Sequence, residues 1–391
     1  MNKKITLLFL LSITFGVAQI PSGYYDSALL PTPLTGYTLK TELHNIIDNN
    51  TNSSGTASYG DMWTLFTQPG FRDNYYENNS SLLDIYSEIP SGADSYEYTS
   101  TADQCGGSTP ISEGGCYNRE HTIPQSVFGG SNTYPMYSDA HFVIPTDNRV
   151  NGWRDNYPFG KVVSSSGVQC TNSTLGNVSS TPCYTTNQSR IGNNLNSGYS
   201  AGYSGVVFEP IDEFKGDIAR ALLYYGTRYE DQVTSWSYVM FNGSSNQVYT
   251  NTFLNILITW HLNDPVSVYE IAKNNAVYTF QGNRNPFIDH PEFVCQIYTT
   301  QCATLSSNSF EFENNISIYP NPTSNGSFSI SSAIELNTIT IYNVNGQIIQ
   351  EIKNPSTIGN ETYNVNNLST GFYLVQLASE NISITKKVIV N

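Results

Sequence analysis

The pattern of residues changes near Ile316, and this change divides the chain into two parts of different construction. Beyond it, apolar and polar residues alternate in short segments separated by turn residues, which is typical of strands with one buried face. The segments are 326–330, 338–344, 347–349, 368–377 and 384–390. Asn345-Gly346 predicts a two-residue hairpin turn between the second and third of them. We therefore expect a small all-β sandwich over 316–391, joined to the rest by a Ser- and Asn-rich linker at 304–315.

The first eighteen residues have the layout of a secretory signal peptide. Lys3 and Lys4 form the positive start, Ile5–Phe15 the apolar core, and Gly16-Val17-Ala18 the small-residue cleavage site. A buried first helix is the alternative. The apolar core is too short to span a bilayer and no other segment comes close, so we expect an exported protein with no membrane span.

The six cysteines fall into three pairs that are close in the sequence. An even number of cysteines in an exported chain predicts disulfides. Other pairings are open, but we expect the local ones: Cys105–Cys116, Cys170–Cys183 and Cys295–Cys302. Zinc is the alternative, although no Cys-x-x-Cys or Cys/His knuckle spacing occurs. The first disulfide would close a loop directly before Asn118 and brace the segment that follows.

The formal net charge of −15 argues against nucleic-acid binding by bulk attraction. The basic residues are unevenly placed, however, because all eight arginines lie between Arg72 and Arg284. A local positive potential can therefore lie on an otherwise acidic molecule. This balance predicts weak nonspecific affinity that falls further as salt is added.

The part before the linker, 19–303, shows helical periodicity in several places, so we expect an α+β fold with a mostly helical body. Patches near 40–48 and 61–66 are expected to be scaffold helices. Three clearer helices follow: one that starts at Glu209-Pro210, one over 252–261, and one that Asp264 caps, with Pro265 in its first position, and that ends before Gly282. The Ser-, Asn- and Gly-rich segment 162–203 is expected to be a loop.

The segment from Asn118 to Gly160 carries the side chains best suited to chemistry. It holds two of the five histidines, three of the eight arginines, and several carboxylate and carboxamide groups. These are the groups that hold a hard cation and activate water beside a phosphate. Together they predict a metal-dependent nuclease.

Asp147 gives a helix-start signal, and the residues 148–156 after it can form a short helix. Asp147, Asn151 and Arg154 then share one face of that helix. Asn151 offers a neutral oxygen ligand for a divalent cation, and Arg154 offers a charge that can grip a phosphate in two places. An exposed helix with ordinary polar residues is the alternative. Gly152 weakens the helix by about 1 kcal/mol relative to alanine, which suggests the close approach of another backbone or of a ligand.

Glu120-His121 lies far enough before that helix to leave room for a second strand and a turn, which gives the order of a ββα unit. His121 is the natural general base to take a proton from water that attacks phosphorus. Magnesium needs only one or two protein ligands, which Glu120 and Asn151 could provide. Neighbouring residues of a regular strand point to opposite faces. Glu120 therefore binds the ion directly only at a bulge or a strand end, and otherwise acts through water.

Asp139 and His141 lie on the same face of an extended segment, which we expect to be the second strand of that unit. The carboxylate and the imidazole could form a pair that orients the site. Equally, His141 could be a core histidine whose hydrogen bonds are satisfied within the protein. The sequence leaves both interpretations open.

Three blocks resemble the signature of the endonuclease I family: Asn-Arg-Glu-His-Thr-Ile-Pro-Gln-Ser at 118–126, Ser-Asp-Ala-His-Phe-Val-Ile-Pro-Thr-Asp at 138–147, and Arg-Val-Asn-Gly-Trp-Arg-Asp-Asn-Tyr-Pro-Phe-Gly at 149–160. Segments at 208–220 and 282–287 resemble later blocks of the same family. The resemblance implies a ββα-metal active site in which His121 is the general base and Glu120 and Asn151 hold magnesium, with manganese or calcium as alternatives.

Some members of that family place a phosphate-binding arginine between the histidine and asparagine motifs. Residues 122–148 contain no arginine here, so Arg149 or Arg154 must serve. Arg119, Asp139, His141 and Asp147 are then expected to touch the substrate or to support the catalytic groups.

The C-terminal part resembles the sorting domain of the type IX secretion system. The residues that carry the resemblance occur in order: Tyr-Pro-Asn-Pro at 319–322, Tyr-Asn-Val-Asn-Gly-Gln at 342–347, Gly-Phe-Tyr at 371–373 and Lys-Lys at 386–387. The resemblance implies passage across the outer membrane by that machinery, followed by release or attachment at the surface. A carbohydrate-binding sandwich is the alternative.

The sequence thus predicts a secreted, monomeric, nonspecific endonuclease that hydrolyses phosphodiester bonds of DNA, and RNA as a further substrate, by a one-metal mechanism that leaves 5′-phosphate ends. A surface adhesin or binding module that has lost catalysis is the alternative. The presence of His121, Asn151 and Glu120 together speaks against that alternative. A zinc protease is a weaker candidate, because no His-Glu-x-x-His motif occurs.

Overall fold

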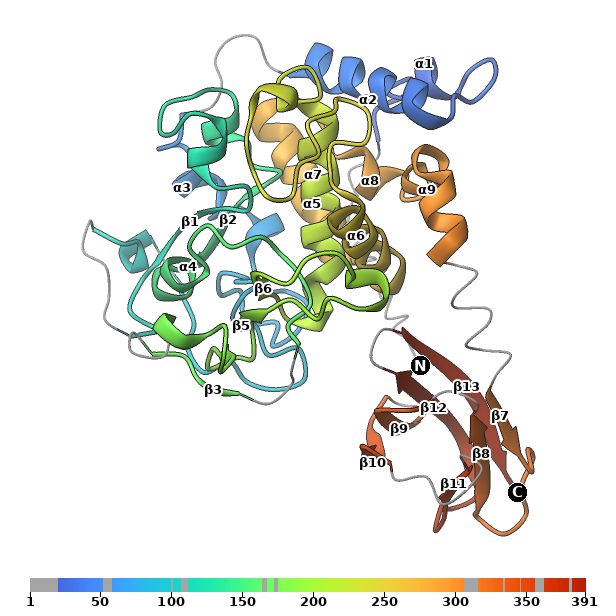
Figure 1. Cartoon of the computed structure of the whole chain (residues 1–391). Coiled ribbons are helices and arrows are strands. Elements are labelled where there is room, and N and C mark those ends of the chain that lie inside the picture. Colours follow the sequence, from blue (N-terminus) through green and yellow to red (C-terminus); the bar gives the residue numbers. More distant parts are fainter. Residues whose placement is uncertain are drawn as a thin grey trace, which may run out of the picture.

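A computed structural model of the chain describes residues 20–51, 58–99, 101–106, 112–163, 167–171, 175–305, 316–332, 335–344, 346–355, 362–379 and 382–391. The predicted signal peptide at 1–18 and most of the predicted linker lie outside these residues. Buried apolar side chains form two separate cores, one within 20–305 and one within 316–391. The helices and strands of these two parts form separate groups in Figure 1. We refer to these two parts as the body and the tail.

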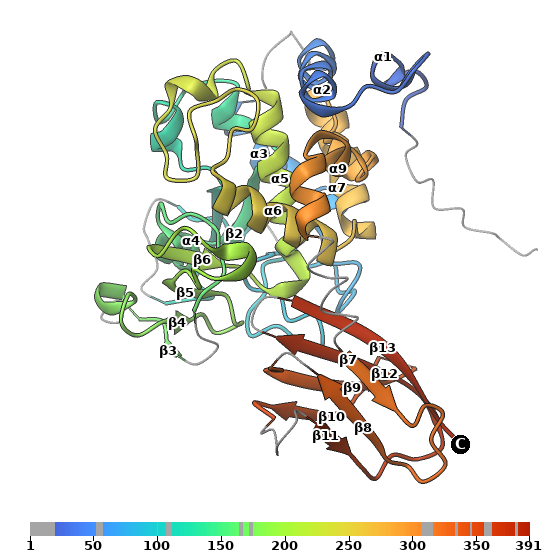
Figure 2. The same ribbon diagram turned by 45° about the vertical axis from the view of Figure 1, so that its right-hand side comes forward.

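All the labelled α-helices of the described residues lie in the body, and one of them is the short helix of the central motif. The others are α1 (Asp26–Leu29), α2 (Gly36–Asn50), α3 (Met62–Leu65), α5 (Lys215–Arg228), α6 (Asn251–Asn263), α7 (Val268–Gln281), α8 (Pro286–Asp289) and α9 (Phe293–Ile297). Every residue of α5 is buried, so this helix lies at the centre of the body, and it contacts both α2 and α6 (Figures 1 and 2). The predicted helices near 40–48, 61–66 and 252–261 are confirmed.

Two predicted helix starts are wrong. Glu209 ends a strand, and α5 begins only at Lys215, because the buried Glu209 carboxylate pairs with the ammonium groups of Lys161 and Lys215 at 2.7 and 2.6 Å. Ser267, rather than Asp264, caps α7: its hydroxyl accepts from the Glu270 amide in a capping box. The predicted end of α7 is confirmed, since Gly282 follows it with a left-handed φ of 88°.

The central motif is a two-stranded antiparallel sheet followed directly by a helix. Strand β1 (Tyr117–His121) pairs with β2 (Val143–Asp147), with His121 opposite Val143 and Tyr117 opposite Asp147. The helix α4 (Asn148–Arg154) starts where β2 ends. The predicted order of strand, strand and helix is therefore confirmed.

The segment 162–203, predicted as loop, contains short strands where the structure describes it. They form a small sheet in the order β3-β4-β5-β6, from β3 (Val168–Gln169), β4 (Cys183–Tyr184), β5 (Arg190–Asn193) and β6 (Val206–Glu209). All three predicted disulfides are confirmed, and Cys170–Cys183 joins the start of β4 to the residue after β3.

The tail is a two-sheet sandwich, as its alternating pattern predicts. One sheet has the order β10-β9-β12-β13 and the other β11-β8-β7. The strands are β7 (Ile316–Tyr319), β8 (Phe328–Ser332), β9 (Thr338–Asn343), β10 (Ile348–Lys353), β11 (Thr362–Val365), β12 (Gly371–Ser379) and β13 (Ile382–Val390). The β9–β10 hairpin forms, and the Asn343 amide donates to the Gln347 carbonyl oxygen. Asn345 of the predicted Asn345-Gly346 turn lies outside the described residues. Among the described helices, none has the length and apolar character needed to cross a bilayer.

Candidate active site

His121 occupies the last position of β1, and its ring is fixed through both nitrogens. Its Nε2 lies 3.1 Å from the carbonyl oxygen of Tyr137, and its Nδ1 lies 3.0 Å from the side-chain nitrogen of Gln125. A carbonyl oxygen can only accept, so Nε2 carries the hydrogen and Nδ1 holds the lone pair. The amide of Gln125 donates to that lone pair. Nδ1 is therefore the nitrogen that can accept a proton.

The surroundings of His121 keep its imidazole neutral. The side chain is only 4% exposed, and the rings of Tyr59 and Tyr137 stack against it with centroids 5.4 and 5.6 Å away. Burial, together with the positive charges of Arg119 and Arg154, lowers the pKa of His121 to about 4. An imidazole that is neutral near pH 7 is in the protonation state that a general base requires.

Glu120 precedes His121 and contacts a different set of residues. Its carboxylate is 3% exposed, and its Oε1 accepts from the Tyr86 hydroxyl at 3.1 Å and lies 3.1 Å from Nη1 of Arg154. Burial raises the pKa of Glu120 to about 7, against the lowering effect of Arg154. Among the described residues none donates a hydrogen bond to the other oxygen, Oε2. One oxygen of this carboxylate is thus held in place and the other is open.

Arg154 was predicted to grip a phosphate, and the structure argues against that role. Its side chain is 1% exposed, and Nη1 and Nη2 donate to the carbonyl oxygens of His121 and Thr122 at 2.9 and 2.5 Å. Together with the contact to Glu120, these bonds direct the guanidinium into the protein. Arg154 holds the end of β1 against α4 and is a positioning residue.

Asn151 lies in the middle of α4, half-buried, and within the described part of the chain its side chain makes no hydrogen bond. Arg154 follows it by three residues, so the two side chains leave neighbouring parts of one helix face. Next to Asn151, Gly152 is exposed, and a Cβ there would meet nothing within 4 Å among the described residues. The predicted close approach of another backbone to Gly152 is therefore wrong, and approach of a ligand stays a prediction.

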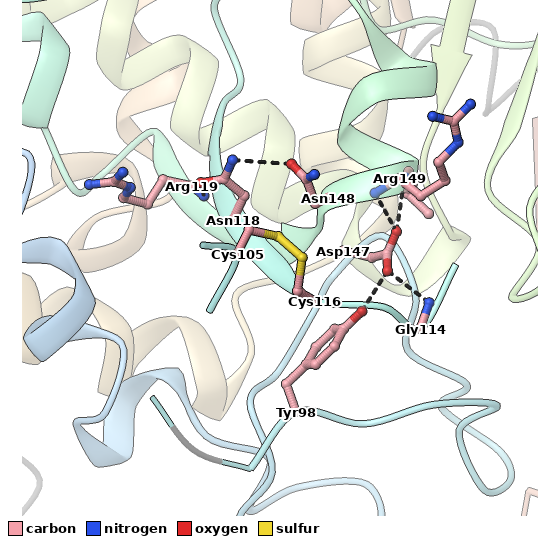
Figure 3. Close-up of a disulfide and its surroundings, with 10 residues drawn as sticks. Tyr98, Cys105, Gly114, Cys116, Asn118, Arg119, Asp147, Asn148 and Arg149 are labelled. Carbon is pink, nitrogen blue, oxygen red and sulfur yellow. Dashed lines mark hydrogen bonds between the residues drawn. A yellow bond between two sulfur atoms is a disulfide. The ribbon is translucent and has the colours of Figure 1, made fainter. Parts of the chain in front are cut away.

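The start of α4 is held by Asp147 and by the first disulfide (Figure 3). Asp147 Oδ1 accepts from the amides of Arg149 and Val150 at 2.7 and 2.8 Å, and Oδ2 accepts from the Tyr98 hydroxyl and the Gly114 amide at 2.5 and 2.9 Å. All of its contacts in the described residues are internal, so Asp147 supports the helix rather than facing a substrate. Gly114 lies inside the loop that Cys105–Cys116 closes, which gives that disulfide the bracing position predicted for it.

The two half-buried arginines of the motif point in different directions (Figure 3). The guanidinium of Arg119 lies between two rings, 3.5 Å from the centroid of Tyr59 and 4.2 Å from that of Trp63, on the side where His121 is found. Arg149 lies 5.3 Å from the ring of Trp153 on α4 itself. Both retain partial exposure, so a contact with phosphate stays a prediction for each.

Asp139 and His141 precede β2 and form a turn, so the prediction that they belong to the second strand is wrong. The Asp139 carboxylate is buried among Arg228, Tyr224, Tyr229 and Gln281, and Arg228 approaches it to 2.6 Å. His141 Nε2 lies 3.2 Å from the carbonyl oxygen of Asn283. His141 is buried in the core with its Nε2 bonded, and the pair does not share the hydrogen-bond partners of His121.

Three residues that support the site were missed from the sequence: Gln125, Tyr137 and Tyr86. Gln125 lies four residues after His121 in a one-turn helix, a spacing that could have suggested contact. Tyr137 accepts the hydrogen bond of His121 through its backbone carbonyl, which leaves no side-chain signal for that bond. Tyr86 lies far from the motif in sequence and belongs to the segment whose Asp84 carboxylate accepts from Thr146 and from the Asp147 amide.

The sequence that carries these features matches the model of a known protein family. The family model for endonuclease I matches residues 35–292, which include β1, β2, α4 and the helices around them. The chain belongs to the endonuclease I family. A second family model, that of a secretion system C-terminal sorting domain, matches residues 317–391 and confirms the prediction for the tail.

Two relatives are similar over most of their length. The extracellular ribonuclease of Bacillus amyloliquefaciens is 29% identical over 278 residues, which cover 70% of this chain and 78% of the relative. The extracellular ribonuclease of Bacillus subtilis (strain 168) is 28% identical with the same coverage. Membership of the endonuclease I family makes the protein a nuclease. The sorting domain in its tail indicates that this nuclease is secreted or held at the cell surface.

Proposed function

We propose that the protein is a metal-dependent endonuclease whose general base is Nδ1 of His121. The observation that carries this proposal is the hydrogen bond of His121 Nε2 to the Tyr137 carbonyl, which leaves the lone pair on Nδ1. The lowered pKa keeps that nitrogen free of a proton at neutral pH. Gln125 donates to Nδ1 in this structure, and a water about to attack phosphorus would take its place.

Glu120 and Asn151 carry oxygen donors that suit a magnesium ion. Glu120 Oε2 and the carboxamide oxygen of Asn151 are hard donors without hydrogen-bond partners among the described residues, and magnesium commonly takes one or two protein ligands and fills its other positions with water and phosphate oxygens. Manganese and calcium take the same donors. When bound, such an ion neutralises the charge that develops on the phosphate and on the departing oxygen.

The geometry of α4 supports a shared position for these two donors. The helix begins directly after Asp147, which lies opposite Tyr117 in the sheet. At its other end, the side chain of Arg154 contacts Glu120 and the carbonyl oxygen of His121. It therefore runs alongside β1. Asn151, near its middle, leaves the same face as Arg154 and so projects toward the end of the strand that carries Glu120.

The remaining roles follow from the same contacts. Tyr86 and Arg154 orient the Glu120 carboxylate through its Oε1. Arg149 and Arg119 are the candidates for contact with the substrate backbone, because they are the arginines of the motif with exposed surface. Phosphate contacts carry no base sequence, so we propose cleavage without sequence specificity.

We propose that both DNA and RNA are substrates. The two Bacillus relatives bear the name of ribonucleases, which supports RNA, and the family supports cleavage within a strand. Nothing in the set of contacts around His121 recognises or excludes a ribose hydroxyl among the described residues. We further propose a monomer in which 19–303 is the nuclease domain and 316–391 directs type IX export.

The test is nicking of supercoiled plasmid, run in parallel with degradation of RNA, in magnesium and in EDTA. We expect activity in magnesium, its loss in EDTA, and a fall of about 10²–10⁴-fold for His121→Ala. His290→Ala is the matched control, since this half-exposed histidine pairs with Glu292 at 2.9 Å, away from the motif. Activity that withstands both EDTA and His121→Ala would rule out the mechanism.

A further inference from the structure

A second group of acidic side chains lies outside the site of His121, and it comprises Asp73, Glu77 and Glu88. One carboxylate oxygen of each lies within 4.8 Å of the corresponding oxygens of the other two. Two oxygens that bind one calcium ion at about 2.4 Å can be separated by no more than about 4.8 Å. The three oxygens are therefore spaced as ligands of a single ion would be.

Glu88 contributes a carboxylate oxygen to this group, and one of its two oxygens lacks a hydrogen-bond partner among the described residues. Glu88 is 1% exposed, and its Oε1 is buried without a hydrogen-bond partner among the described residues. Glu77 Oε1 is buried and unpartnered in the same way, and Asp73 is fully buried. In the described part of the chain no lysine or arginine forms an ion pair with any of the three. A charged, buried carboxylate whose oxygen has no partner is strongly unfavourable, so Glu77 and Glu88 must be neutralised by a cation or by a proton.

The loop that carries Glu77 is organised around the first acid of the group. The Asp73 carboxylate accepts four backbone amides, those of Tyr75 and Tyr76 on Oδ1 and those of Glu77 and Asn78 on Oδ2. Backbone bonds between Asp73 and residues 80 and 81 close the same loop. The backbone of Glu77 is thus fixed by the fold, which places its side chain beside Asp73.

A proton is the competitor of a cation at this position. Burial raises the pKa of Glu88 to about 10, and the neighbouring charges of Asp94, Glu77 and Asp73 raise it as well. Burial also raises the pKa of Glu77. A protonated Glu88 would donate a hydrogen bond to Glu77, so the experiment has to separate a shared proton from a bound ion.

We propose that Asp73, Glu77 and Glu88 bind one calcium ion. Several protein carboxylates gathered around one point suit calcium, which takes six to eight oxygens in adaptable geometry. Magnesium is held by fewer protein ligands and keeps its waters. This site is separate from the donors Glu120 and Asn151 and goes beyond the proposed nuclease mechanism.

The ion would also stabilise the catalytic motif. Glu88 ends a segment in which Asp84 accepts hydrogen bonds from Thr146 and the Asp147 amide, and Tyr86 donates to Glu120. Fixing Glu88 therefore fixes the two residues that hold the start of α4 and the Glu120 carboxylate. Calcium at this position joins the loop of Glu77 to the motif of His121.

The test is thermal unfolding of the full chain with CaCl₂ and with EDTA. We expect calcium to raise Tm by about 4 °C or more in the wild type and in Asn151→Ala, which removes a donor of the other site. Glu88→Gln and Glu77→Gln should abolish the rise, whereas Asp231→Asn, an exposed acid, should retain it. Because Asn151→Ala is expected to respond like wild type, failure of the nuclease mechanism would leave this result unchanged.

Two outcomes would overturn the proposal. One is a wild type whose Tm is the same in calcium and EDTA, which would show that a shared proton suffices. The other is a rise that persists in both glutamine variants. If Glu88→Gln does not fold, terbium luminescence of the wild type excited through Tyr75 and Tyr76 gives a second measurement. Displacement of that signal by calcium, and its loss in Glu77→Gln, supports the site, and a signal unaffected by Glu77→Gln contradicts it.

Discussion

Arg154 Nη1 lies 3.1 Å from Glu120 Oε1 and also donates to the carbonyl oxygen of His121 at 2.9 Å, so one buried guanidinium binds both neighbouring residues of the catalytic strand. A guanidinium in this position cannot also meet a phosphate at the surface. It links α4 to β1 and sets where the Glu120 carboxylate lies. Stability and activity are thereby coupled through a single side chain.

Replacement of Arg154 should therefore act on stability first. Arg154→Met leaves the Glu120 carboxylate and two carbonyl groups without their partner, and we expect the free energy of unfolding to fall by about 3–5 kcal/mol. Urea unfolding measures this. The double variant Glu120→Gln/Arg154→Met should lose less than the sum of the single variants, because the two residues interact directly. If Arg154→Met leaves the free energy of unfolding unchanged and raises only KM, Arg154 acts as a phosphate ligand instead.

Tyr86 should influence metal affinity without touching the metal. Tyr86→Phe removes the hydroxyl that donates to Glu120 Oε1 but keeps the packed ring, and we expect the magnesium concentration for half-maximal activity to rise about tenfold. Tyr225→Phe is the control, because within the described residues its buried hydroxyl has no hydrogen-bond partner. Equal magnesium dependence in the two variants would mean that Tyr86 does not position Glu120.

Local sequence signals predicted the elements that local interactions determine. The Asp147 cap of α4, the left-handed Gly282 after α7 and the alternating strands of the tail were all correct. The start of α5 was not, because the pairing of Glu209 with Lys161, distant in sequence, keeps Glu209 in a strand. The sequence predicts Asp264 as a cap, but its carboxylate accepts from the Gly216 amide at the start of another helix.

For the site, the sequence identified which residues have suitable chemistry, but not the directions in which their side chains point. The side-chain chemistry of His121, Glu120 and Asn151 predicts their roles, and the structure adds a fixed tautomer for His121 and an unbonded oxygen for Glu120. The inward direction of Arg154 could not be foreseen, because it depends on how α4 lies along β1. Asp139 and His141 likewise belong to a core network whose other members, such as Arg228 and Asn283, come from distant segments.

Buried neutral histidines should make the protein sensitive to acid. Burial lowers the pKa of His261 to about 4, against about 6.5 in an unfolded chain. Between these values the unfolded state binds the proton and the folded state does not, so the stabilising contribution is present above pH 6.5 and is lost as the pH falls toward 4. For one histidine this amounts to roughly 3 kcal/mol.

The comparison that isolates this effect is wild type against His261→Gln, in which the amide can still donate to the Pro291 carbonyl oxygen that lies 3.0 Å from Nε2. Buried carboxyls act in the opposite direction, since burial raises the pKa of Asp264 to about 7, but they are common to both proteins. Urea unfolding at pH 7 and pH 4.5 should show a smaller loss of stability in the variant. An equal loss of stability between pH 7 and pH 4.5 in wild type and variant would show that His261 does not contribute to the acid sensitivity.

The disulfide before β1 should matter for activity as well as for stability. Cys116 accepts the Asn148 amide through its carbonyl oxygen at 2.9 Å, and Gly114 in the same loop donates to Asp147, so the loop holds the start of α4 (Figure 3). We expect Cys105→Ser/Cys116→Ser to lower the free energy of unfolding by about 2–4 kcal/mol and to reduce kcat of the folded protein. Cys295→Ser/Cys302→Ser, which removes the disulfide at α9, should lower stability while leaving kcat unchanged. Assays at a temperature where both variants are folded separate the two effects, and an equal fall in kcat for both would contradict a local role for the first disulfide.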